Sequence, residues 1–368
     1  MEHTLKSPAR TVFGAGTLDE LNREIPPFLR KILLVAGNHV VSGGLLERVK
    51  TILAGRELTV CSGIHPEPPL PDVQHLIDTG REAGVHAVVA IGGGSVIDSA
   101  KTAAALIPLS GGVKEYFDGS AAITGKGLFF AALPTTAGTG AEITPNAVLT
   151  DPETQIKKSL RHDTMMADVA IIDPDLLAEC SEKVAVYSGL DAFTQAVESY
   201  ISRGATELTQ RYARHAAGLL YRNLPRFCAD RGDAEARSGT AEGSMLGAIA
   251  FTTSGLGAVH GIGHPIGSLL HLPHGLCCAI LLPKVLRWNQ PLCEKQYEEL
   301  AKTCGVADFA GSVEDLCRNL GVPDGFHEYG LNESHYDFIL KNCRSGSMKQ
   351  NPRPMSDEEV IAFLRSIS

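Results

Sequence analysis

Short continuous runs of apolar residues alternate with segments of helical spacing along the first half of the chain. A continuous apolar run bounded by turn residues is typical of a strand buried on both faces. The expected strands are 31–36 (KILLVA), 57–61, 86–91 (HAVVAI), 128–133 (LFFAAL) and 169–172, and the expected helices are 44–53, 73–83 and 95–106. This alternation predicts a parallel sheet covered by helices on both faces.

The second half of the chain has a different pattern, with long segments of helical spacing and few β-branched runs. The expected helices are 184–202, 207–223, 234–252, 297–303, 313–320 and 357–366. The turn Asp173-Pro174-Asp175 and the polar stretch 179–183 separate the two patterns. We therefore expect an α/β domain over residues 1–180 and an all-α domain over residues 181–368.

Composition and charge narrow the class of protein. The 368 residues are 44% hydrophobic and 20% charged, which is ordinary globular composition and enough chain for two domains. The net charge is −9, and the sequence has no Lys/Arg block that could follow a nucleic acid backbone. An anionic ligand would need a locally built site, because the overall field repels it.

The cysteines and the N-terminus indicate a cellular compartment. Nine cysteines are scattered along the chain without a CxxC pair, and Cys277 and Cys278 are adjacent, which is not the pattern of a disulfide framework. Residues 1–6 do not begin a secretory signal, and no apolar run approaches the roughly 20 residues that span a bilayer. We expect a soluble protein of the reducing cytoplasm, with no membrane partner.

Two glycine-containing loops follow predicted strands. Gly92-Gly93-Gly94-Ser95 comes between a strand and a helix, where glycines allow close approach of a ligand and free N–H groups attract phosphate. Ser95 would equally suit a helix N-cap. The second loop, 134–142 (PTTAGTGAE), offers hydroxyl groups and glycines after another strand, although a polar connection needs only one or two such residues. In a parallel sheet both loops leave the carboxyl edge, where ligands bind.

Histidines and a carboxylate are concentrated in the second half. Asp191 and Gln195 are four residues apart and share one helix face. His260 and His264 have the same spacing, and His274 follows in Leu272-Pro273-His274-Gly275, so that four of the 13 histidines lie between 260 and 274. Carboxylate and imidazole groups suit Fe²⁺ or Zn²⁺, whereas an amide oxygen is a weaker donor. The alternative is that these histidines fill core positions.

The motifs together resemble those of the iron-containing alcohol dehydrogenases, a family related in fold to glycerol dehydrogenases and dehydroquinate synthases. The matching segments span nearly the whole chain: GGGSVIDSAK (92–101), PTTAGTGAE (134–142), DVAIIDPDL (168–176), GLDAFTQAVESY (189–200), VHGIGHPIG (259–267) and LPHG (272–275). The resemblance implies an N-terminal dinucleotide-binding α/β domain, a C-terminal helical domain, and a cleft in which a metal and the nicotinamide meet.

The resemblance also implies roles for individual residues. Those expected to bind NAD or NADP are Gly37, Gly93, Gly94, Ser95, Asp98, Thr135, Thr136, Thr139 and Lys157. Those in the metal-ligand positions are Asp191, Gln195, His260 and His274. His264 matches a histidine beside the nicotinamide and the substrate.

Gln195 departs from the family pattern, which has a histidine as the second ligand. Either the amide oxygen of Gln195 coordinates a metal that Asp191, His260 and His274 also hold, or the site has little metal and His264 or His260 polarises the carbonyl, as in metal-independent relatives such as maleylacetate reductases. We favour a retained divalent metal, Fe²⁺ or Zn²⁺.

The expected reaction is hydride transfer between nicotinamide and an alcohol or aldehyde, with a divalent metal polarising the substrate oxygen. His264 is the expected proton relay, and His260 is the other expected catalytic residue. Because the first strand runs into Gly37-Asn38-His39 without the acid that usually holds the ribose of NAD, we favour NADP over NAD. An acid from another loop could replace it.

The substrate and the assembly are less constrained by the sequence. The segment 346–353 contains Lys349 and Arg353, which would favour an anionic aldehyde such as phosphonoacetaldehyde if it faced the substrate, although we favour an ordinary solvated loop. A dehydroquinate synthase-like lyase and an inactive cofactor-binding relative are the remote alternatives. The resemblance suggests a homodimer or a larger homo-oligomer, assembled through a strand at Thr11–Phe13.

Overall fold

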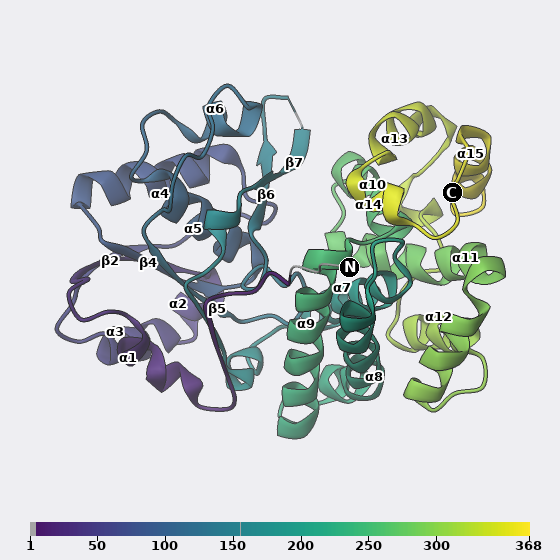
Figure 1. Ribbon diagram of the computed structural model, residues 1–368, viewed down its shortest axis with the longest axis horizontal. Helices are drawn as coiled ribbons and strands as arrows, with labels where there is room; N and C mark the ends of the chain where they lie inside the picture. The colour runs from purple at the N-terminus through teal and green to yellow at the C-terminus, as the bar shows by residue number, and fades with distance from the viewer. Residues whose placement is uncertain (1–4, 155) are drawn as a thin grey trace. The chain divides into compact units, whose positions relative to one another are not determined.

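The computed structural model describes residues 5–154 and 156–368 and divides into two compact units (Figure 1). The α/β unit contains Ser7–Thr136 and Gly140–Cys180, and the helical unit contains Ser181–Ser368 with the short segment Ala137–Thr139. Residues 1–4, part of the N-terminal segment that lacks the pattern of a secretory signal, lie outside the described residues.

The α/β unit is built on a six-stranded sheet of order β1-β8-β5-β4-β2-β3, in which every neighbouring pair is parallel. Its strands are β1 (Arg10–Phe13), β2 (Lys31–Ala36), β3 (Glu57–Cys61), β4 (Ala87–Gly92), β5 (Phe129–Pro134) and β8 (Val169–Ile172). The predicted parallel sheet is therefore confirmed. The expected N-terminal strand exists as β1, which pairs with β8 of its own chain at one edge of the sheet.

Helices cover both faces of this sheet, because the strands present apolar side chains alternately to each face. Leu33 and Val35 pack in one core cluster with residues of α4, α5 and α6, whereas Ile32 and Leu34 pack in the other with residues of η1, α1, α2 and α3. The bounds are η1 (Thr17–Glu20), α1 (Leu21–Glu24), α2 (Asn38–Ser42), α3 (Leu45–Ile52), α4 (Leu70–Ala83), α5 (Gly94–Leu106) and α6 (Val113–Asp118), with η2 (Asp163–Met165) and η3 (Pro174–Leu177) in the later connections.

The strand order reverses direction between β2 and β4. From β2 the chain crosses to β3 on one side, and it then returns to β4 on the other side of β2 and continues to β5. In open parallel sheets a ligand binds beyond the carboxyl ends of the strands at such a switch point. The residues that follow β2, β4 and β5 are therefore placed where a ligand would be held.

A two-stranded antiparallel hairpin, β6 (Asn146–Asp151) and β7 (Ile156–Arg161), was not expected from the sequence. The second strand, IKKSLR, is largely exposed and polar, so it lacks the apolar run by which the other strands are recognised. Lys101 of α5 binds the segment that leads into this hairpin. Its Nζ donates to the carbonyl oxygens of Ala141 (2.6 Å), Thr144 (2.7 Å) and Asn146 (2.6 Å).

The second unit is wholly helical, as predicted. Its elements are α7 (Glu182–Ile201), α8 (Glu207–Ala229), α9 (Ala234–Ser254), α10 (Ala258–Leu270), α11 (His274–Cys304), α12 (Phe309–Asn319), η4 (His327–Tyr329), η5 (Glu333–His335), α13 (Tyr336–Cys343), α14 (Gly346–Gln350) and α15 (Asp357–Arg365). The expected helix at 297–303 is the end of α11, which contains Pro283 and Pro291 and is kinked at Cys293. α10, which contains most of the predicted histidine cluster, was not expected as a helix because glycine and proline disfavour it.

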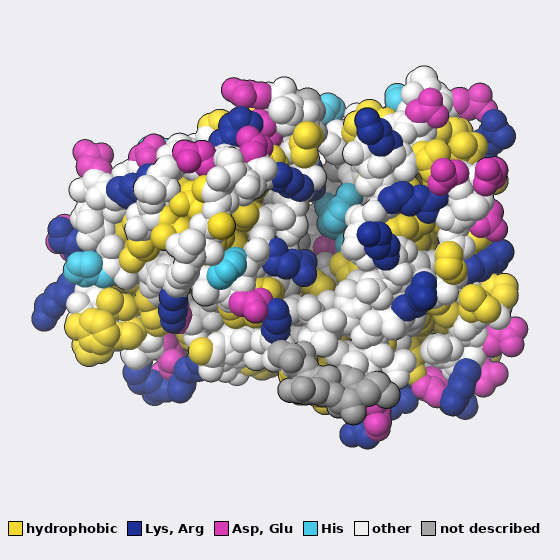
Figure 2. Space-filling view, turned by 45° about the horizontal axis from the view of Figure 1, so that its top comes forward, with side chains coloured by type: hydrophobic (Ala, Val, Ile, Leu, Met, Phe, Trp, Pro, Cys, Tyr) yellow, Lys and Arg dark blue, Asp and Glu magenta, His cyan; other side chains and the backbone are white. Residues whose placement is uncertain are grey.

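Acidic and basic side chains are interspersed over the face of the molecule in Figure 2. Among the described residues, no helix on its own is long and apolar enough to cross a membrane; α9 and α10 meet those criteria only as a pair, and that pair is bent by 101°.

Replacing Lys101 by methionine should destabilise the α/β unit by roughly 3 kcal/mol or more, because three buried carbonyl groups and the nearby carboxylate of Asp98 would lose their cation. Thermal unfolding followed by circular dichroism measures this. The matched control is Lys126→Met, which removes an exposed ion pair with Asp168 and should cost less than about 1 kcal/mol. Equal effects of the two substitutions would contradict the role of Lys101.

Candidate functional site

The glycines at the carboxyl edge of the sheet lie at the switch point. Gly37 follows β2, and its N–H donates to Ile91 O of β4 at 2.9 Å. Gly92 ends β4, and a Cβ there would lie 2.7 Å from Cβ of Val96. Glycine at this position therefore lets the first turn of α5 fold back closely against the end of β4.

Helix α5 begins directly after this edge. Gly93 is its N-cap, without a side-chain cap bond, and the helix starts at Gly94. The alternative role of Ser95 as N-cap is therefore wrong: Ser95 lies in the first turn, and its Oγ accepts a hydrogen bond from the N–H of Glu67 at 3.2 Å. A helix N-terminus without a side-chain cap leaves backbone donors for an anion, as phosphate binding requires.

The second predicted loop is divided between the two units. Thr135 and Thr136 continue from β5; Thr135 N–H donates to Gly92 O at 3.0 Å, and its Oγ1 is 2.9 Å from Nε2 of His39. Thr139 belongs to the segment Ala137–Thr139 of the helical unit, in which a Cβ on Gly138 would lie 2.7 Å from Cβ of Ser188. Thr135 and Thr136 thus belong to the α/β unit, whereas Thr139 is grouped with the helical unit.

Asp98 and Lys157 both lie in the α/β unit with protein partners of their own. Asp98 Oδ2 accepts a hydrogen bond from Val148 N–H at 2.9 Å, and Lys157 Nζ is 2.7 Å from Oε1 of Glu67. Burial raises the pKa of Asp98 to about 6, against the opposing charge of Lys101. A dinucleotide would meet these groups already oriented by their partners.

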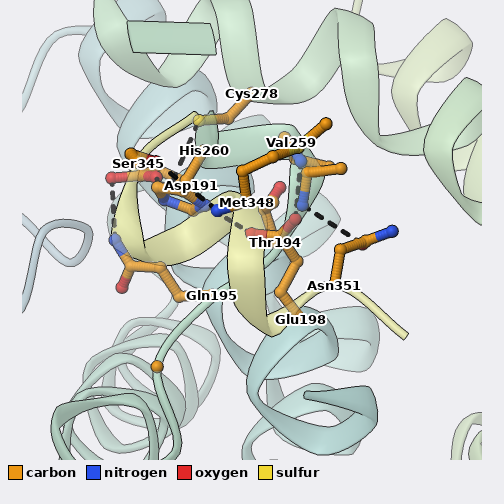
Figure 3. Close-up of polar contacts among 12 residues, drawn as sticks. Asp191, Thr194, Gln195, Glu198, Val259, His260, Cys278, Ser345, Met348 and Asn351 are labelled. Carbon is orange, nitrogen blue, oxygen red and sulfur yellow. Dashed lines mark hydrogen bonds and ion pairs between the residues drawn. The ribbon is translucent and has the colours of Figure 1, made fainter. Parts of the chain in front are cut away.

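The other predicted residues meet inside the helical unit (Figure 3). Asp191 and Gln195 come from α7, His260 from α10 and His274 from the first turn of α11. Asp191 Oδ1 is 3.3 Å from Nε2 of His260 and 3.6 Å from Nε2 of His274, and Asp191 and His260 are each 2% exposed. Gln195 Nε2 donates to Asp191 Oδ2 at 3.0 Å, which leaves Oδ1 directed at the imidazoles.

Two residues that the sequence did not single out complete this cluster. Glu198, 2% exposed, accepts from His260 Nδ1 at 2.6 Å and from Val259 N–H at 2.7 Å. Cys278 Sγ is 3.6 Å from Nε2 of His274 and 3.9 Å from Nε2 of His260. Helical spacing could have found both, because Glu198 is seven residues after Asp191 and Cys278 is four after His274.

Burial and mutual contact shift the pKa values in this cluster. Burial disfavours the imidazolium form of His260, but Cys278, Asp191 and Glu198 outweigh it and raise the pKa of His260 well above its ordinary value. Burial raises the pKa of the Cys278 thiol to about 12, partly opposed by His260. Positive charge is therefore favoured at this point of the helical core, either on His260 or on a bound cation.

The cluster fits a divalent cation. One ligand atom each from Asp191, His260, His274 and Cys278 lies within 4.8 Å of the others. Asp191 Oδ1, although buried, accepts no hydrogen bond from the described residues. A buried oxygen without a hydrogen-bond donor is costly unless a cation satisfies it. Because Glu198 fixes Nδ1 of His260, Nε2 is the nitrogen left for that cation.

His264 lies beside the cluster, with its ring centroid 4.9 Å from that of His274 and 6.0 Å from that of His260. It is half-buried, whereas His260 is buried. His264 is therefore as near to His274 as His260 is, whose ring centroid is 5.3 Å from that of His274.

Close packing of α11 against α7 brings His274 to Asp191. Gly275 follows His274, and a Cβ on it would lie 2.1 Å from the carbonyl oxygen of Tyr187 on α7. Any side chain at this position would push the two helices apart, which explains the glycine of the LPHG motif physically.

The basic segment 346–353 does not form an open anion site on Arg353. The Arg353 guanidinium stacks on the ring of Trp288 at 3.8 Å and donates to the carbonyl oxygen of Trp288 at 3.0 Å. Residues 346–350 form α14, which packs on α10 through buried Met348, whereas Lys349 is exposed. The Arg353 guanidinium thus has protein partners of its own, and a role for it towards an anionic aldehyde stays a prediction.

A glycine-lined switch point in a parallel sheet, together with a buried cluster suited to a divalent cation, defines the class of metal-assisted, dinucleotide-dependent oxidoreductases. The iron-containing alcohol dehydrogenase family model matches residues 8–174, and the C-terminal model of the Fe-containing alcohol dehydrogenase family matches residues 185–368. The chain belongs to the iron-containing alcohol dehydrogenase family, and it is an oxidoreductase that acts on CH–OH groups.

Individual relatives match over nearly their whole length. Long-chain-alcohol dehydrogenase 1 of Geobacillus thermodenitrificans is 32% identical over 97% of this chain and 96% of its own. A 1-propanol dehydrogenase of Salmonella typhimurium is 33% identical over 99% of this chain and 100% of its own. The structure of sulfoacetaldehyde reductase from Bifidobacterium kashiwanohense in complex with NAD+ superimposes with a TM-score of 0.93 at 28% identity, covering 100% of this chain and 99% of that one.

Replacing Glu198 by glutamine should weaken cation binding by about 10–100-fold, because one amide oxygen cannot serve both His260 and Val259. The measurement is Zn²⁺ affinity by competition with a chromophoric chelator. Glu298→Gln, at an exposed position of α11, serves as the control and should leave the affinity unchanged. Wild-type affinity in Glu198→Gln would show that Glu198 does not position His260.

Proposed function

We propose that this enzyme interconverts small alcohols and aldehydes with NADP(H) in preference to NAD(H), and that Asp191, His260 and His274 hold a divalent cation, Fe²⁺ or Zn²⁺. The observation that carries the proposal is the buried Asp191 Oδ1, which accepts no hydrogen bond within the described chain and faces the Nε2 atoms of both histidines at 3.3 Å and 3.6 Å. The α/β unit is the proposed dinucleotide-binding domain.

Each proposed residue has a separate task. When bound, the nicotinamide exchanges the hydride and the cation polarises the substrate oxygen. Gln195 holds Asp191 through its amide nitrogen, and Glu198 holds His260 in one tautomer. His264, half-buried beside the ligands, is the proposed proton relay between the substrate oxygen and solvent.

The cofactor-binding residues remain those at the carboxyl edge of the sheet and near it. Gly93, Gly94 and Ser95 start α5, Thr135 and Thr136 follow β5, and Asp98, Lys157 and Thr139 are the further proposed contacts. The preference for NADP rests on Gly37, which occupies the end of β2 without a carboxylate. We also propose a cytoplasmic homodimer: no two of the nine cysteines, all within the described residues, form a disulfide, and light scattering of the purified protein tests the dimer.

Removal of the metal should abolish NADPH-dependent reduction of short aldehydes, and one equivalent of Zn²⁺ or Fe²⁺ should restore it, because the substrate oxygen then regains its Lewis acid. Elemental analysis of anaerobically purified protein, paired with NADPH oxidation before and after chelation, measures both. A metal-free protein with full activity would contradict the proposal and favour a maleylacetate reductase-like mechanism.

Two variants separate the roles of the histidines in the same assay. His274→Ala should lose the cation and the activity together. His264→Ala should keep the cation and lose about 100-fold in kcat, as expected for loss of an acid–base group. Normal kcat in His264→Ala would exclude the proton relay.

The Gly37→Asp substitution should shift the ratio of kcat/KM for NADPH over NADH towards NADH by at least about 10-fold, because a carboxylate there repels the 2′-phosphate and accepts from the ribose hydroxyl. Space permits it: the nearest atom to a Cβ on Gly37 is a His39 ring carbon at 3.4 Å. Thr51→Asp, which adds the same charge at an exposed position of α3, is the control. A wild-type enzyme that prefers NADH would refute the NADP proposal.

A further inference from the structure

We propose that the Cys278 thiolate is the fourth protein ligand of the cation, at the place left by the histidine that the family has where this chain has Gln195. The proposal rests on the cation site of the proposed function and adds one ligand to it. It makes the donor set one carboxylate, two imidazoles and one thiolate.

Four of the six separations between donor atoms are near those of a tetrahedral site, and all six are within 4.8 Å. Bonds of about 2.1 Å to nitrogen or oxygen and about 2.3 Å to sulfur place neighbouring ligand atoms about 3.4 Å apart, or about 3.6 Å where sulfur is one of them. Asp191 Oδ1 is 3.3 Å and 3.6 Å from the two imidazole nitrogens. Cys278 Sγ is 3.9 Å and 3.6 Å from the same nitrogens. The sulfur therefore stands at ligand distance.

The geometry of Gln195 argues against its amide oxygen as the fourth ligand. Its nitrogen donates to Asp191 Oδ2 at 3.0 Å, and reversing the amide would place its oxygen against the carboxylate oxygen. Figure 3 shows the amide oxygen of Gln195 on the side away from Asp191. Gln195 therefore orients the ligand Asp191, and the sulfur of Cys278 takes the place of the amide oxygen as fourth ligand.

A purely structural role would leave the Cys278 sulfur among apolar atoms. Instead its Sγ faces two imidazole nitrogens and is fully buried, 0% exposed. Its neighbour Cys277 is equally buried, but its Sγ lies by Gly267, where a Cβ on that glycine would be 3.4 Å away. The two adjacent cysteines therefore have different surroundings, which makes Cys277 a matched control.

A thiolate changes the chemistry of the site in two ways. The thiol proton is released to solvent when the cation binds, and the thiolate and the Asp191 carboxylate together balance the charge of a divalent cation in this buried place. A soft sulfur ligand also favours Zn²⁺ over hard cations such as Mg²⁺. The substrate oxygen would then be a fifth ligand, as in zinc sites that expand their coordination during reaction.

The test is the absorption spectrum of the protein loaded with Co²⁺, because only a thiolate ligand gives an intense sulfur-to-cobalt charge-transfer band in the near ultraviolet. We expect this band in the wild type and in Cys277→Ser, and its loss in Cys278→Ser. Cys278→Ser should also bind Co²⁺ at least about 10-fold more weakly. If Cys278→Ser fails to fold, X-ray absorption of the wild-type zinc protein replaces it and should show one sulfur in the first shell.

The outcomes separate this inference from the proposed function. One equivalent of bound Co²⁺ without the charge-transfer band, or zinc without a sulfur neighbour, overturns the Cys278 ligand and leaves the metal-dependent reaction intact. A band that persists in Cys278→Ser also overturns it, since another thiol would be the ligand. A wild-type protein that binds no metal and still reduces aldehydes overturns the cation site of the proposed function itself.

Discussion

The arrangement of α7, α10 and α11 around the cluster depends on the burial of Asp191 in the middle of α7. Its carboxylate is 2% exposed, and Glu198, two turns further along the same helix, is exposed to the same small extent. Two buried carboxylates cost several kcal/mol each unless positive charge or hydrogen bonds offset the loss of water. Glu198 is satisfied by Val259 N–H and His260. Asp191 accepts from Gln195 on one oxygen, and its other oxygen, 3.3 Å from Nε2 of His260, accepts no hydrogen bond from the described residues. That oxygen calls for positive charge, either on His260 or on a bound cation.

The packing of α10 and α11 against α7 explains why glycines lie next to ionisable residues in the motifs of this chain. α10 must bring His260 close to α7, and α11 must bring His274 and Cys278 close to the same point. Glycine permits both approaches: a Cβ on Gly257 would lie 2.7 Å from Glu198 Oε1, and a Cβ on Gly275 would lie 2.1 Å from Tyr187 O. The glycines and the ionisable residues of these motifs therefore belong to one packing arrangement. Side chains at the glycine positions would hold the helices apart, and the ionisable groups would then not meet.

Much of the α/β unit could be predicted because its strands are buried on both faces. The apolar runs fix β2, β3 and β8 at the expected residues, whereas β7, an exposed polar strand, has no such run and was missed. In the helical unit, α10 was missed because Gly261, Gly263 and Pro265 disfavour a helix that packing nevertheless imposes. Spacing paired Asp191 with Gln195 and His260 with His264, and the family resemblance implied that Asp191, His260 and His274 meet. Cys278 had no such signal, because the matching family segments do not include it.

The pairing of Gln195 with Cys278 shows how a site can change one ligand without rebuilding its frame. Replacing a ligand on α7 by an amide leaves that helix able to hold Asp191 through the amide nitrogen, so the position of the carboxylate is kept. The lost donor need not be restored on the same helix, because α11 packs against α7 and has Cys278 one turn after His274, with its sulfur 3.6 Å from Nε2 of His274. A single thiol there supplies both a donor atom and a negative charge. The packing of α7, α10 and α11 is then unchanged, and a change of the side chain at position 278 alone alters the charge of the site and the softness of its donor atoms.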